Sequence, residues 1–106
     1  MTVNILGTNY SLIQSNKADD QCLLDCSGYC DCSTKKIVID TFQELPNSLK
    51  NLDEYRRQVV RHELIHAFLN ESGLGAESWG MNEEIVDWIA YQFPKLLKVF
   101  EETDCI

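Results

Sequence analysis

The chain contains two histidines, His62 and His66, and a glutamate follows the first of them directly. On a helix, residues four apart lie on one face about one turn from each other, so two imidazoles at this spacing can bind one metal ion. Glu63 then lies beside the coordination position that the protein ligands leave open. The chemistry that these three residues predict is hydrolysis assisted by a bound zinc ion.

A catalytic zinc site needs a third protein ligand, and the sequence offers Glu83 and Glu84. We favour Glu83, because Asp87 follows it at helical spacing and can accept the second ring N–H of a ligating histidine. Glu84 stacks instead on Trp88, which is better suited to packing than to binding metal. The alternative is that both glutamates only stabilise the first turn of a helix through its dipole.

The first of the two helices that must position these side chains is predicted over residues 53–69. Its apolar residues recur at helical spacing and form a broad surface. Asn51 or Asp53 is suited to cap its start. The residues that follow favour a turn that brings the next segment back over this helix; they are Ser72, Gly73, Gly75 and Gly80.

The second helix is predicted from about residue 81 to Phe93. Pro94 lacks a backbone N–H, so it predicts a kink or a restart before a further helical segment over residues 95–102. Glu83, Asp87 and Tyr91 recur at every fourth position, which places them on one face of this helix. The remaining positions are mostly apolar, as expected for a helix that packs on another element.

Strand patterns precede both helices. Residues 2–13 alternate around a Gly-Thr-Asn run, which predicts a bent strand or a short hairpin, and residues 29–40 predict two strands joined by a turn. The fold class expected is therefore α+β: a small N-terminal antiparallel sheet, then the helix with the histidines, then a second ligand-bearing helix. A single domain over residues 1–106 is expected from the length.

The run from His62 to His66, followed by the segment from Glu83 to Ala90, resembles the zincin metallopeptidases that use a glutamate as third ligand. It is most similar to the ImmA/IrrE family and to small zincin-like proteins of phages and prophages. The resemblance implies a minimal zincin-like domain in which His62, His66 and Glu83 bind one zinc ion. Many members carry a further DNA-binding or sensory region, for which 106 residues leave no room.

The resemblance also implies the reaction. Glu63 would be the general base that takes a proton from the attacking water, and the product would be a hydrolysed peptide bond. An edge strand before the first helix would bind the extended protein or peptide substrate as an added strand; an ordinary protected sheet edge is the alternative. For a group that supports the oxyanion, Tyr91, Tyr29 and Tyr55 are candidates, and each is equally interpretable as an ordinary half-buried tyrosine.

Two other functional classes are compatible with the sequence. In the first, the metal site is structural and the domain is a binding or regulatory module that recognises a partner without cleaving it. In the second, the chain is a small helical regulator without a metal. Glu63 favours the enzyme, because a purely structural site has no need of a carboxylate beside an open coordination position.

The chain has five cysteines, and four of them fall within a short segment: Cys22, Cys26, Cys30 and Cys32. Their odd total and the absence of a signal peptide favour reduced thiols in a cytoplasmic protein, in the bacterial host if a phage or prophage encodes it. A second metal centre at these four residues is the alternative, although the paired Cys-x-x-Cys pattern of structural zinc sites is missing.

The net charge of −8 and the isoelectric point near 4.5 bear on the partners. No basic stripe is present that would neutralise phosphates, so neither nucleic acid nor an anionic membrane is expected to bind.

Overall fold

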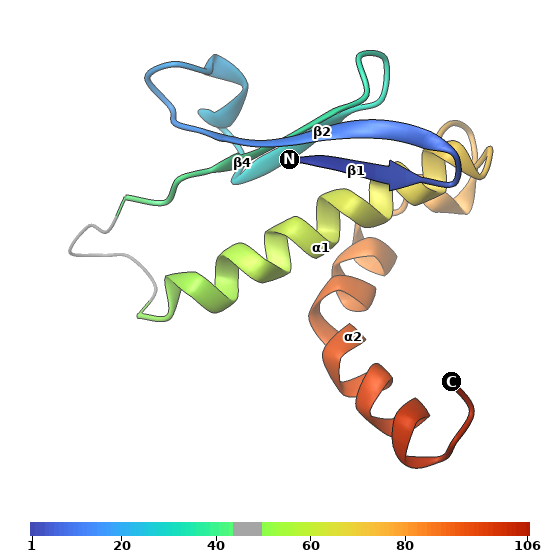
Figure 1. Cartoon of the computed structure of the whole chain (residues 1–106). Helices are drawn as coiled ribbons and strands as arrows, with labels where there is room; N and C mark the ends of the chain where they lie inside the picture. Colours follow the sequence, from blue (N-terminus) through green and yellow to red (C-terminus); the bar gives the residue numbers. More distant parts are fainter. Residues whose placement is uncertain (44–49) are drawn as a thin grey trace.

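Four strands form one sheet in the computed structural model of the chain, which describes residues 1–43 and 50–106. In chain order they are β1 (Thr2–Ile5), β2 (Thr8–Ser15), β3 (Gly28–Asp31) and β4 (Lys36–Asp40). Their order in the sheet is β1-β2-β4-β3, so that β3 is an edge strand. Two long helices follow, and the α+β class expected from the sequence is confirmed (Figure 1).

Residues 2–15 form a hairpin, the second of the two alternatives that the sequence left open, and the predicted strand pair within residues 29–40 is also present. Strands β1 and β2 pair antiparallel around Leu6 and Gly7, whose φ angles of 49° and 94° suit a two-residue turn. Strands β3 and β4 also pair antiparallel, with Asp31 opposite Lys36. Local alternation and turn residues were therefore sufficient to locate the strands.

The prediction of a wholly antiparallel sheet is wrong, because β2 and β4 run parallel, with Leu12 opposite Ile37. A parallel pair requires a crossover between its strands. Here the crossover consists of the 3₁₀ helix η1 (Gln21–Leu23) and of β3, which returns along the outer side of β4. The alternation of side chains is the same for either strand direction, so it could not distinguish the two arrangements.

Helix α1 (Leu52–Glu71) lies across one face of the sheet (Figure 1). It begins after Asn51, whose side chain accepts a hydrogen bond from the Glu54 N–H at 3.1 Å, as predicted for a capping residue. The core fills the space between this helix and the sheet; its buried residues are Ile5, Tyr10, Ile37, Ile39, Val59 and Ala67.

The C-terminal end of α1 is attached to the sheet through Glu71. Its carboxylate accepts hydrogen bonds from Lys35 Nζ at 2.8 Å, Tyr10 Oη at 2.7 Å and Thr8 Oγ1 at 3.1 Å. These bonds, that from Lys35 above all, lower the pKa of Glu71 to about 2. The part of α1 that carries the histidines is therefore fixed relative to the sheet on the C-terminal side.

Helix α2 (Glu83–Glu102) begins after the 3₁₀ helix η2 (Trp79–Met81), and Asn82 caps it by accepting from the Ile85 N–H. It continues through Pro94, so of the kink or restart that the sequence predicted, the restart is absent. Proline cannot donate to the carbonyl four residues earlier, which is that of Ala90. Arg61 Nε of α1 donates to this oxygen instead, at 2.6 Å, and satisfies it.

Only the first half of α2 packs on α1, where Val86 and Ala90 are buried. The second half extends away from the sheet and the first helix (Figure 1). Apolar side chains there are largely exposed, among them Phe93, Val99 and Phe100. Within the described residues, no helix is long and apolar enough to cross a membrane.

Candidate metal centre

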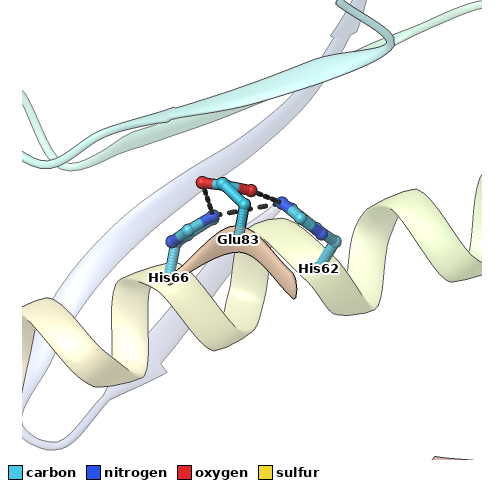
Figure 2. Close-up of side chains that lie close together, drawn as sticks. All are labelled: His62, His66 and Glu83. Carbon is cyan, nitrogen blue, oxygen red and sulfur yellow. Dashed lines mark hydrogen bonds and ion pairs between the residues drawn. The ribbon is translucent and has the colours of Figure 1, made fainter. Parts of the chain in front are cut away.

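His62 and His66 of α1 meet Glu83 from the first turn of α2 (Figure 2). The two histidine Nε2 atoms are 3.1 Å apart. Glu83 spans them, with Oε2 at 3.0 Å from His62 Nε2 and Oε1 at 3.0 Å from His66 Nε2. The three residues that the sequence proposed as metal ligands therefore converge on one point.

The loop between the helices makes this convergence possible. It turns sharply enough that a Cβ atom on Gly80 would lie only 2.4 Å from the Leu74 carbonyl oxygen, so this position admits no side chain. Ser78 then caps η2 by accepting from the Gly80 N–H. The close path of the backbone sets the first turn of α2, and with it Glu83, against the histidine face of α1.

One ligand atom from each of His62, His66 and Glu83 lies within 4.8 Å of the other two, so this group could hold a metal ion. Ligand atoms bound at about 2.0 Å at tetrahedral angles lie about 3.3 Å from one another. The Nε2 atoms of His62 and His66 lie 3.1 Å apart, and each lies 3.0 Å from a different carboxylate oxygen of Glu83. Two imidazoles and a carboxylate are also a donor set that zinc prefers, and they leave the fourth position open.

Asp87 supports the first histidine from behind. Its Oδ1 lies 2.7 Å from His62 Nδ1, the contact that the four-residue spacing from Glu83 predicted. A proton held on Nδ1 by this carboxylate leaves the Nε2 lone pair directed at the other ligands. Asp87 thus orients the ring and makes it a better metal ligand.

Glu63 is nearly enclosed, with 6% of its surface exposed, and its Oε1 is 3.8 Å from His62 Nε2. Burial raises the pKa of Glu63 to about 7; His62 opposes this shift, whereas Glu83 and Asp87 add to it. A carboxyl group with a pKa in this range can both take and return a proton near neutral pH. Glu63, which the sequence analysis proposed as the general base, is therefore a buried carboxyl group beside His62.

A cleft of roughly 510 Å³ opens over these residues. One wall is the edge strand β3 with the cysteine-rich segment, and α1 forms the other side. The loop before α2 and the start of that helix close one end. The residues that line the cleft around the ligands are Cys26, Gly28, Tyr29, Cys30, Cys32, Glu63, Leu69, Asn70, Gly75, Gly80 and Met81.

The three candidate tyrosines are in different places. Tyr29 lines the cleft, and its hydroxyl donates to Asp20 Oδ2, which raises the pKa of Tyr29 to about 12. Tyr55 contacts Ser27 Oγ at 3.0 Å beside a different pocket. Tyr91 is 56% exposed and is not among the residues that line the cleft. Tyr29 therefore shares the cleft with His62, His66 and Glu83, whereas Tyr91, the tyrosine proposed with Glu63 from the sequence, lies outside it.

Cys26, Cys30 and Cys32 line the cleft, which the sequence analysis did not predict. The spacing of Cys30 and Cys32 was the available signal, because residues two apart in an extended segment point to the same side. All five cysteines are free thiols, as expected. In the described part of the chain, His62, His66 and Glu83 are the one group of metal-binding residues whose ligand atoms converge, so the four-cysteine centre is not formed.

Comparisons with protein-family models, curated proteins and solved structures gave no significant match to this chain.

Proposed function

We propose that this protein is a zinc-dependent peptidase of the zincin type, similar to the ImmA/IrrE metallopeptidases, that hydrolyses a peptide bond in an extended protein segment in the cytoplasm. The observation that carries the proposal is the buried carboxylate of Glu63 beside the His62–His66–Glu83 group at the base of an open cleft. A site with a purely structural metal does not require this carboxylate.

His62, His66 and Glu83 would hold the metal ion, with Asp87 fixing the ring of His62. A zinc ion bound there supplies a Lewis acid that polarises the scissile carbonyl and lowers the pKa of the attacking water. Glu63 takes a proton from that water and then donates it to the leaving amine. The enclosure of Glu63, which keeps bulk water away from its carboxylate, supports this exchange.

The substrate proposed is an extended polypeptide. Strand β3 is at the sheet edge and lines the cleft, so its outer backbone N–H and C=O groups can pair with an added strand. Such pairing would carry a substrate carbonyl past the metal ligands. Cys30, Leu69 and Met81 offer apolar surface to its side chains. Of the three candidate tyrosines, Tyr29 is the one that lines this cleft.

The test compares the zinc-loaded protein with Glu63→Gln on a library of unfolded peptides, with new amino termini identified by mass spectrometry. We expect cleavage by the wild type and at least a hundredfold lower rate in Glu63→Gln, with zinc content unchanged. Glu84→Gln is the matched control and should cleave at the wild-type rate. Equal cleavage by Glu63→Gln would remove the general base, and no cleavage by any form would favour a binding module with a structural metal.

A further inference from the structure

Two of the thiols that line the cleft lie in contact. Cys30 Sγ and Cys32 Sγ are 3.6 Å apart, on the wall formed by β3. The other cleft thiol, Cys26, points elsewhere, since its Sγ lies 3.0 Å from the Cys22 carbonyl oxygen. Cys22 and Cys105 are exposed. The proposed hydrolysis does not use the thiol chemistry of Cys30 and Cys32, so their contact needs a separate explanation.

We propose that Cys30 and Cys32 are a redox-active dithiol that reacts with low-molecular-weight disulfides, such as oxidised glutathione, to form a reversible disulfide in the wall of the cleft. The inference concerns these two residues alone and does not depend on peptidase activity.

The reaction is a pair of thiol–disulfide exchanges. The thiolate of Cys32 attacks one sulfur of oxidised glutathione, which forms a mixed disulfide and releases one glutathione thiolate. Cys30 Sγ then loses its proton and attacks the Cys32 sulfur, which breaks the mixed disulfide and releases the second glutathione. The protein loses two hydrogens and two electrons, and one oxidised glutathione becomes two reduced molecules.

The order of attack follows from burial. Cys30 packs against the core, and burial raises the pKa of its thiol, so it is a poor first nucleophile. It is well placed for the second step, because contact with Cys32 gives that exchange the advantage of an intramolecular reaction.

The backbone allows the cross-link to close. A disulfide bond is about 2.05 Å long, so the two sulfurs must approach by roughly 1.5 Å. Cys30 is held by its pairing with Ile37 in β4, whereas Cys32 lies beyond the last residue of β3, in the turn that ends near Lys35 at φ 58°. Cys32 is outside the register of this pairing, so the approach of the two sulfurs has to come mainly from the turn. So short a covalent loop is strained, which favours easy reduction over permanent cross-linking.

The place of the pair gives the cross-link a consequence. Asp31, between the two cysteines, is the last residue of the edge strand, and Cys30 and Cys32 share the cleft with Glu63 and the histidines. Oxidation would therefore fix the end of the strand that lines the cleft.

The experiment uses the variant Cys22→Ser/Cys26→Ser/Cys105→Ser, which retains only Cys30 and Cys32. It is incubated with oxidised glutathione, with and without zinc, and its intact mass and disulfide-linked peptides are measured. We expect complete loss of two hydrogen masses, a link between Cys30 and Cys32, and full reversal by excess reduced glutathione. In the same background Cys30→Ser should stop at one stable glutathione adduct on Cys32.

Stable glutathione adducts on the triple variant without loss of two hydrogens would overturn the proposal, as would no reaction of the folded protein. Circular dichroism of each variant, recorded first, confirms that it is folded. Because the experiment measures covalent mass, its result on the Cys30–Cys32 pair is independent of whether the protein cleaves peptides.

Discussion

We expect the ionised carboxylate of Glu63 to lower the folding stability of the metal-free protein at neutral pH. Burial raises the pKa of Glu63 from 4.5 to about 7. In the unfolded chain the group loses its proton near its ordinary pKa, whereas in the folded protein it keeps the proton up to the higher value. Folding stability is therefore lost as the pH rises between these two values. The substitution that removes the ionisable group at nearly constant shape is Glu63→Gln.

The expected size follows from the pKa difference of about 2.5, at 1.36 kcal/mol for each unit. Glu63→Gln should be more stable than the metal-free wild type by about 3 kcal/mol at pH 8, and the two should differ little at pH 4. For a chain of this length such a difference raises the melting temperature by roughly 10 °C or more. This difference is the energetic cost of burying the ionised carboxylate of Glu63.

The assay is urea unfolding followed by circular dichroism, in the presence of a chelator, at a series of pH values from 4 to 8. Glu84→Gln is the matched control, because Glu84 is exposed on α2 and should give curves close to the wild type. A Glu63→Gln variant that is less stable than the wild type at pH 8 would show that burial does not destabilise the ionised carboxylate. That result would mean that the carboxylate is engaged in a stabilising charge pair.

Three further predictions concern the ligand set and its support. Glu83→Ala should weaken zinc binding by about a hundredfold or more in competition with a chromogenic chelator, whereas Glu84→Ala should change it little; the reverse order would transfer the ligand role. Hydrogen bonds lower the pKa of Glu71 from 4.5 to about 2, so the wild type should lose folding stability as the pH falls between these values. In thermal unfolding, the melting temperature of Glu71→Gln should therefore fall less steeply with decreasing pH. Arg61→Met should lower the free energy of unfolding in urea by about 1–3 kcal/mol, because it leaves the Ala90 carbonyl without its donor. Adding Pro94→Ala should recover part of this loss, and purely additive effects of the two substitutions would contradict the coupling.

Much of the metal centre could be predicted because its information is local. The spacing of His62 and His66 fixes their common face on any helix, and the spacing of Glu83 and Asp87 does the same on the second. Asp87 can contact His62 Nδ1 once these faces of α1 and α2 pack together. The glycine-rich loop between the helices indicated that they would.

The features that were predicted wrongly or missed depend on contacts between distant segments. The parallel pairing of β2 with β4 is decided by the path of the crossover. Pro94 does not interrupt α2 because Arg61, far away in the sequence, satisfies the freed carbonyl. Helical spacing placed Tyr91 on the same face of α2 as Glu83, but Tyr91 is eight residues further along the helix and lies outside the cleft. Tyr29 of the edge strand lines the cleft instead. No local pattern contains these facts.

The central claim is that His62, His66 and Glu83 bind one catalytic metal ion, and metal content tests it most directly. The purified protein, supplied with zinc and then dialysed, is measured by plasma mass spectrometry beside His66→Ala and Glu83→Ala. We expect about one zinc ion per wild-type chain and much less in both variants. A wild type without zinc, or variants that retain it in full, would show that these three residues are not zinc ligands.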